Sequence, residues 1–197
     1  MRSLLSVCVW IIGLGMSGRV LAQAISGGSP HSGDAGLTYH WVRTNAPPNG
    51  GCGCFPLNGG GISGSWNFGR QLAAVAEFSV DHTSSALSSS RSLTLTSYLG
   101  GARYRLPQFW KHGDRALEPF AQVLVGAAHA GGGMAGVADG TSAFAGRLGG
   151  GVDLPLNNAI SVRLIQADYY MTTFDNSANN HQNNILVGAG VILHWFH

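Results

Sequence analysis

Apolar and polar side chains alternate with a period of two along most of the chain. Every second residue from Ile185 to Trp195 is apolar, and the same holds from Leu72 to Val80, where Glu77 stands on the opposite face. Successive side chains of a strand point to opposite faces of the sheet. The pattern therefore predicts β-strands that have one apolar face and one polar or small-residue face.

The chain contains eight such runs, at 36–44, 61–69, 72–82, 92–105, 117–130, 142–154, 159–171 and 184–196. In the seventh run the polar face changes phase after Ile165, and one extra residue would restore it, which predicts a β-bulge near Ile165. The connections after runs one, three, five and seven are long, whereas those after runs two and six are short. The connection after run four, 106–117, is also long and breaks this alternation. Long loops at one end and short turns at the other are typical of outer-membrane barrels.

Aromatic residues gather near the ends of the predicted strands. At the turn end these are Trp66, Phe68, Tyr104, Phe120, Trp195 and Phe196, and Tyr170 lies at the loop end. Amphipathic rings favour the headgroup depth of a bilayer, so two aromatic girdles are predicted. The residues predicted to lie at the two membrane interfaces are Tyr39, Trp41, Trp66, Phe144, Tyr169 and Trp195.

Composition supports a membrane protein over a soluble domain. Only 10% of the 197 residues are charged, against about 25% in soluble domains. The formal charge of +2 comes from Arg2 and Arg19, so the rest of the chain is balanced and no nucleic-acid surface is expected. No stretch after Ala24 approaches the roughly 18 consecutive apolar residues of a membrane-spanning helix.

The first 24 residues have the organisation of an export signal. Arg2 precedes an apolar stretch at 4–16, and Ala22-Gln23-Ala24 has the form of a cleavage site. We therefore expect residues 1–24 to be a signal peptide and residues 25–197 to form one barrel domain in an extracytoplasmic compartment.

A signal peptide, eight amphipathic strands and an aromatic-ended last strand resemble the small bacterial outer-membrane β-barrels, the OmpA-like porin-family domain. In that family the last strand carries an assembly signal, which Gly190, Leu193 and Trp195 match here. Gly188 departs from the usual polar residue, and the chain continues past Trp195 to His197. The resemblance implies an all-β, eight-stranded, antiparallel up-and-down transmembrane barrel in the outer membrane. Its implied partners are outer-membrane lipids and the barrel-assembly machinery, and no cofactor is expected.

The polar faces of the strands carry charges of both signs. An eight-stranded barrel has an interior just wide enough for side chains, and buried charges are tolerated when they are paired. A polar network that fills the lumen is therefore predicted, with a narrow polar conduit or a catalytic carboxylate as alternatives. The residues predicted to form it are Glu77, Arg147, Asp153, Arg163, Gln166 and Asp168, with Gln122 as a further candidate.

Other candidate sites are weaker. None of the eight histidines stands in an H-E-x-x-H motif, and His40 and His129 are predicted as lone polar residues at the rim. Some outer-membrane barrels that act on lipids, such as lipid A deacylases, use a Ser/His/acid group on the outer surface. No His-x-Ser stands on any predicted strand, so an enzyme is not expected, although a triad assembled across strands stays an alternative.

Cys52-Gly53-Cys54 lies in the predicted loop 45–60. An oxidising compartment favours a disulfide between the two cysteines, with free thiols or metal binding as alternatives. For the whole chain, the predicted role is structural, envelope integrity or surface interaction. The competing interpretations are a narrow pore, a soluble lipocalin-like barrel whose apolar face points inward, and a lipid-modifying enzyme.

Overall fold

A computed structural model describes residues 32–45, 54–86, 91–108, 110–112, 115–132, 140–175 and 180–195. The predicted signal peptide and its cleavage site lie outside these residues. Eight long strands carry the fold: β1 (Gly33–Asn45), β2 (Cys54–Phe68), β3 (Leu72–Ala86), β4 (Arg91–Arg105), β7 (Glu118–Gly131), β8 (Thr141–Pro155), β9 (Ile160–Thr172) and β10 (Gln182–Trp195). Two short strands, β5 (Lys111–His112) and β6 (Arg115–Ala116), pair with each other.

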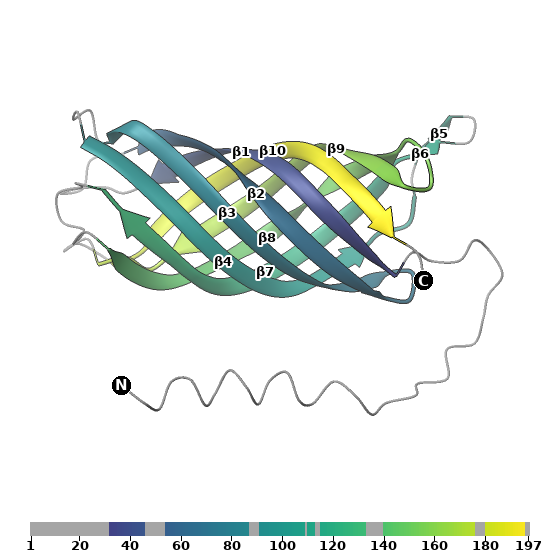
Figure 1. Ribbon diagram of the computed structural model, residues 1–197, viewed down its shortest axis with the longest axis horizontal. Coiled ribbons are helices and arrows are strands. Elements are labelled where there is room, and N and C mark those ends of the chain that lie inside the picture. Colours follow the sequence, from purple (N-terminus) through teal and green to yellow (C-terminus); the bar gives the residue numbers. More distant parts are fainter. Residues whose placement is uncertain are drawn as a thin grey trace, which may run out of the picture.

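The eight long strands form a closed antiparallel barrel in the order β1-β10-β9-β8-β7-β4-β3-β2 (Figure 1). Each strand pairs with the long strands that precede and follow it in the chain, and β1 closes the barrel against β10. The predicted eight-stranded up-and-down topology is confirmed. None of the residues described here forms a helix long and apolar enough to cross a bilayer.

The two faces of the wall differ in chemistry. Large apolar side chains such as Leu37, Ile62 and Val191 are exposed on the outside, whereas the inside holds charged side chains such as Arg147 together with a buried apolar cluster that includes Leu124. A soluble lipocalin-like barrel would present a polar outer surface to water. This interpretation is therefore wrong, and the wall has the arrangement of a membrane-spanning barrel.

The predicted bulge in β9 is confirmed. Leu164 and Ile165 are consecutive and both exposed, and the pairing with β8 passes from Val152–Ile165 to Asp153–Arg163. The extra residue keeps Arg163 and Gln166 on the inner face, although three positions separate them. Without it, one of these two side chains would face lipid.

The start of the second strand was predicted wrongly. β2 begins at Cys54 rather than at residue 61, and it pairs with β1 from Asn45–Cys54 onward. Pro56 and the glycines at 59–61 gave this segment the appearance of a loop. β2 pairs with β3 only from Asn58, so Pro56 lies at a free edge, where a missing N–H is tolerated.

The long connection after β4 also has a structural explanation. It folds into the β5–β6 hairpin, which projects from the end of the barrel that carries the short turns (Figure 1). The amide of Leu117 donates to the carbonyl of Trp110 (3.0 Å), and Gln108 donates to Glu118 (2.8 Å). The alternation of long and short connections therefore fails at this position because the connection contains its own hairpin.

Candidate functional site: the polar interior and the outer wall

Arg147 of β8 is the centre of the first polar cluster in the lumen. It is completely buried, and its guanidinium donates to the carboxylate of Glu77 and to Ser79 Oγ (2.9 Å) on β3. The same guanidinium lies 4.5 Å from the ring centre of Tyr170, whose hydroxyl bonds Ser97 (2.6 Å). Strands on opposite sides of the barrel are thus joined across the lumen.

A second cluster begins at Asp168, the carboxylate of which accepts hydrogen bonds from two amides, Gln166 (2.6 Å) and Gln122 (3.2 Å). Gln166 in turn accepts from Arg163 Nη1 (2.8 Å). Arg163 also binds Asp153 with two parallel bonds, from Nε (2.8 Å) and Nη2 (3.0 Å). This bidentate geometry is the strong form of an Arg–carboxylate pair.

Phe120 connects the second cluster to Arg103. The guanidinium carbons of Arg163 and Arg103 lie 4.3 and 4.7 Å from the centre of its ring, and Arg103 donates to Gln122 Oε1 (2.9 Å). Phe120 is buried in the lumen, so its prediction as a girdle residue is wrong. The same correction applies to Tyr170, which is completely buried. Both rings serve as cation–π partners of interior arginines.

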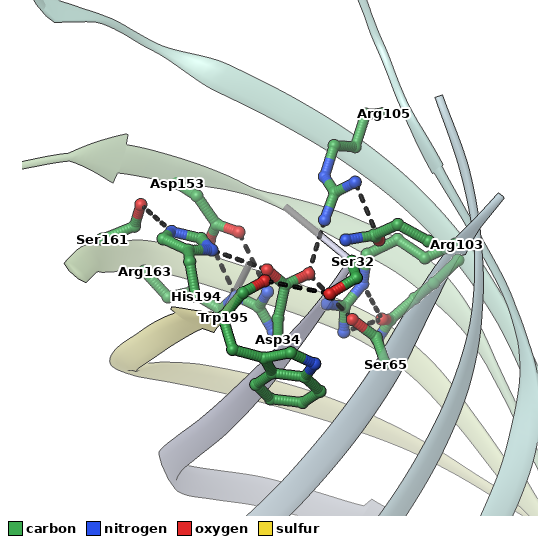
Figure 2. A network of polar contacts seen from close by, with 12 residues as sticks. Ser32, Asp34, Ser65, Arg103, Arg105, Asp153, Ser161, Arg163, His194 and Trp195 are labelled. Atoms are coloured by element: carbon green, nitrogen blue, oxygen red, sulfur yellow. Dashed lines mark hydrogen bonds and ion pairs between the residues drawn. The ribbon is translucent and has the colours of Figure 1, made fainter. Parts of the chain in front are cut away.

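A third cluster closes the turn end of the barrel around Asp34 of β1 (Figure 2). Its Oδ2 accepts from Ser65 (2.8 Å) and from Arg105 Nη2 (2.5 Å), and its Oδ1 bonds His194 Nδ1 (2.6 Å). The other imidazole nitrogen bonds Ser161 Oγ at 2.6 Å. These contacts join β1, β2, β4, β9 and β10 and include the seam where the first and last strands meet.

The Asp34–His194–Ser161 connection has the order of a hydrolase triad. It lies inside the barrel, however, whereas a lipid-modifying site would open on the outer wall. Ser161 is 1% exposed, and Asp34 is also occupied by Arg105 and Ser65. The arrangement satisfies both imidazole nitrogens and fixes the seam. It does not offer a nucleophile to a substrate.

His40 does not lie at the rim as predicted. It is completely buried on the inner face of β1, where Nε2 bonds Thr38 Oγ1 (2.8 Å) and Nδ1 lies 3.7 Å from Asp81 Oδ1. A Cβ at Gly61 would stand 2.9 Å from the imidazole, so this glycine makes room for the ring. His40 points inward because the even-numbered residues of β1 face the lumen, as Asp34 and Thr38 also do.

All six polar residues predicted for the interior lie in the lumen. Asp153 is the least buried of them, with 18% of its side chain exposed. The sequence analysis missed the Asp34 cluster because the first strand was predicted to begin at residue 36, three residues after its observed start. Thr38 and His40 both face the lumen. The same alternation, continued back along the chain through Gly36, would have placed Asp34 inward as well.

The predicted interface residues Tyr39, Trp41, Trp66, Phe144, Tyr169 and Trp195 all have exposed side chains on the outer wall. Near the loop end, outward side chains also form polar pairs between neighbouring strands. These pairs are Tyr39–Asn58 (2.8 Å), His82–Thr94 (2.9 Å), His129–Ser142 (3.0 Å) and Tyr169–Asn183 (2.5 Å). His129 is therefore an outward residue with a partner rather than a lone one. The pairs mark the level at which the apolar wall gives way to a polar one.

Of the predicted assembly signal, Leu193 and Trp195 point outward, 50% and 37% exposed. Gly190 faces the neighbouring β1, where a Cβ would stand 2.2 Å from the carbonyl oxygen of Leu37. Close packing against β1 therefore requires glycine at this position. Recognition by the assembly machinery remains a prediction.

Cys54 is disulfide-bonded and is the first residue of β2, not part of a loop. Cys52, its predicted partner, lies outside the described residues.

We expect Cys52→Ser to leave the barrel folded and to lower its stability little, because a ring this small removes little unfolded-state entropy. Intact-mass analysis of alkylated protein, with and without reductant, checks the pairing. Alkylation of both thiols in unreduced protein would contradict it.

No protein-family model matches the chain, and no curated protein matches its sequence. Among solved structures it is similar to Neisserial surface protein A, with a TM-score of 0.63 and 14% identity over 83% of this chain and 97% of that one. Ail, the attachment invasion locus protein of Yersinia pestis, gives a TM-score of 0.45 at 13% identity over 82% and 99% of the two chains. The first likeness concerns the fold. Together with the apolar outer wall, it defines a small integral β-barrel of the outer-membrane class.

Proposed function

We propose that the protein is an integral barrel of the bacterial outer membrane with a structural, envelope-integrity or surface-interaction role, and that its lumen does not conduct. The barrel anchors the chain, and the connections at the loop end face the exterior. We propose no enzymatic activity and no cofactor.

The observation that carries the closed lumen is the set of contacts across it. Arg147, Arg163 and Arg103 are each buried, and each contacts an interior ring. An eight-stranded barrel has little room beyond its own side chains. The ion pairs Arg147–Glu77, Arg163–Asp153 and Arg105–Asp34 lie at successive levels, so a hydrated ion would have to break several of them in turn.

The wild-type protein should therefore give little or no steady ion current when it is inserted in planar lipid bilayers at neutral pH. A variant in which Arg147, Glu77 and Ser79 are all replaced by alanine is the comparison, because it removes the contacts of the first cluster from the lumen. Single-channel recording measures both proteins. Regular open-channel steps from the wild type would overturn the closed lumen and favour the narrow pore.

A further inference from the structure

One carboxylate buried in the lumen has no hydrogen bond. Glu77 and Asp34 each accept from an arginine, and Asp168 accepts from two amides. Both carboxylate oxygens of Asp81 on β3, by contrast, have no hydrogen-bond partner among the described residues, although this side chain is completely buried. Burying an unpaired carboxylate is costly, so this position requires a proton donor or a positive charge.

The group that faces Asp81 is the imidazole of His40 on β1. In register, His40 and Asp81 lie on the two sides of Gly59, and His40 Nδ1 is 3.7 Å from Asp81 Oδ1. A Cβ at residue 59 would stand 2.6 Å from this oxygen, so the glycine lets the two side chains approach. At 3.7 Å the two atoms are too far apart for a hydrogen bond, and Nδ1 has no other partner within the described part of the chain.

The contacts of the other imidazole nitrogen show what Nδ1 lacks. Nε2 of His40 bonds Thr38 Oγ1 (2.8 Å), and this hydroxyl donates its one proton to the carbonyl of Gly61 (3.3 Å). The hydroxyl oxygen therefore accepts from Nε2, which must carry the hydrogen. In a neutral imidazole, Nδ1 then has a lone pair, and this lone pair faces the carboxylate of Asp81. Two acceptors face each other, and the pair lacks one proton.

The strands beside the pair bring no charge to it. The cross-strand partners of His40 and Asp81 are Gly59, Gly188 and Leu95, none of which titrates. Val42 and Leu57 are the next inward residues toward the loop end, and both are completely buried. The pair therefore lies against an apolar layer, where an uncompensated charge is most costly.

The charged and titratable groups across the lumen have other partners. Arg147 on β8 and Tyr170 on β9 act on Asp81 electrostatically, but the guanidinium of Arg147 is paired with Glu77, and the hydroxyl of Tyr170 bonds a serine of β4. The Nε of Arg147 also has no partner, yet the single charge of this side chain is balanced by Glu77. Asp168 on β9 is held by its two amides. A proton on His40 is therefore the charge that suits Asp81 best.

We propose that His40 and Asp81 form a proton-binding site in the lumen. The folded barrel takes up one proton from the solvent at Nδ1, and the imidazolium donates this proton to the carboxylate after a small rotation that closes the gap of 3.7 Å. The bond is charge-assisted, and both partners are buried. The site goes beyond the proposed function, because it makes the stability of the barrel depend on pH.

The sign of this dependence follows from proton linkage. In the unfolded chain His40 is an ordinary histidine, which releases its proton between about pH 5 and 8. The stabilisation is complete below the pH of that release, and it is lost as the pH rises through the value at which the folded barrel releases the proton. Between these two values the equilibrium constant for unfolding should rise by up to about tenfold per pH unit.

The test compares the wild type with Asp81→Asn, both as refolded full-length barrels in phospholipid vesicles. The amide of an asparagine donates to Nδ1 of a neutral imidazole, so this variant satisfies the pair without a proton. It should be more stable than the wild type at about pH 8.5 and less stable at about pH 5.5, where the imidazolium has lost its carboxylate. Reversible urea unfolding across this pH range measures both proteins. Taking the ratio of their unfolding constants cancels the contribution of His194, the other interior imidazole that faces a carboxylate.

Two further variants locate the effect. His40→Gln removes the titrating group, so its stability should lack the part of the pH dependence that Asp81→Asn also loses. His129→Gln, which removes an outward imidazole bonded to Ser142 (3.0 Å), should keep the dependence of the wild type. The folding of each variant is checked by its mobility on a gel before and after heating. If Asp81→Asn does not refold, the comparison of His40→Gln with His129→Gln decides.

A ratio of unfolding constants that stays the same from about pH 5.5 to 8.5 would overturn the site, because it would show that the neutral imidazole already carries its hydrogen on Nδ1. Equal pH dependence in His40→Gln and the wild type would also overturn it. Regular open-channel steps from the wild type would refute the closed lumen and leave this site standing, because the unfolding measurement does not depend on conduction.

Discussion

Glu77→Leu should lower the free energy of unfolding by about 3–5 kcal/mol, the usual cost of leaving one member of a buried ion pair without its partner. The carboxylate of Glu77 bonds Arg147 inside the lumen, and neither side chain is more than 3% exposed. Without Glu77, the guanidinium keeps Ser79 and the ring of Tyr170, and neither neutralises its charge. Reversible urea unfolding in phospholipid vesicles measures the change.

The double variant Glu77→Leu/Arg147→Leu is the control for this experiment. It removes both charges at once, so it should be more stable than Glu77→Leu alone by at least about 3 kcal/mol, because replacing a buried pair by apolar residues is often neutral or stabilising. The gain over the single variant measures the cost of the unpaired guanidinium. A double variant less stable than the single one would show that Arg147 supports the fold through other contacts and not through this pair.

Val191→Arg should lower the free energy of unfolding by about 2–4 kcal/mol, because it places a charge in the hydrocarbon region. Val191 is exposed on the outer face of β10, opposite Leu37 and four positions from the interface residue Trp195. The same vesicle unfolding measures it. Equal stability of this variant and the wild type would refute the lipid-facing assignment.

Asn183→Arg is the depth control, since Asn183 lies on the same face of β10 at the level of the outward polar pairs. Its cost should be about 0–1 kcal/mol, as for positions near an interface. Gly190→Arg would be a poor control, although Gly190 lies on the inner face of β10, opposite to Val191. A Cβ there would meet the backbone of β1 at 2.2 Å, so any loss of stability would combine steric and electrostatic causes.

The large number of charges in so narrow a lumen is explained by how they are distributed. Arg163 and Arg103 share one aromatic ring, and amides of Gln122 and Gln166 connect the arginines to Asp168. A side-chain amide can donate and accept hydrogen bonds at the same time. Gln122 and Gln166 therefore accept from the arginines with their oxygens and donate to Asp168 with their nitrogens, which connects charged groups without placing two like charges in direct contact. The network therefore extends across β4, β7, β8 and β9.

Much of the fold was determined by local pattern alone. Alternation of side chains is a property of a single strand, so the sequence from Leu72 to Val80 was enough to predict which residues face lipid. The bulge at Ile165 could be predicted for the same reason, because one extra residue reverses the faces within its own strand. The inward positions of Glu77, Arg147 and Arg163 followed from that phase.

The partners of these residues were decided only by the tertiary structure. Asp34 and His194 are 160 positions apart in the chain, and they meet because closure places β10 beside β1. Phe120 and Tyr170 were predicted to lie at membrane interfaces, although each stands two positions from a residue predicted inward, Gln122 and Asp168, so strand phase alone should have placed both rings in the lumen. Only the tertiary structure shows their partners, the arginines that lie over the two rings from other strands. Register and closure are long-range properties, and no local pattern in the sequence contains them.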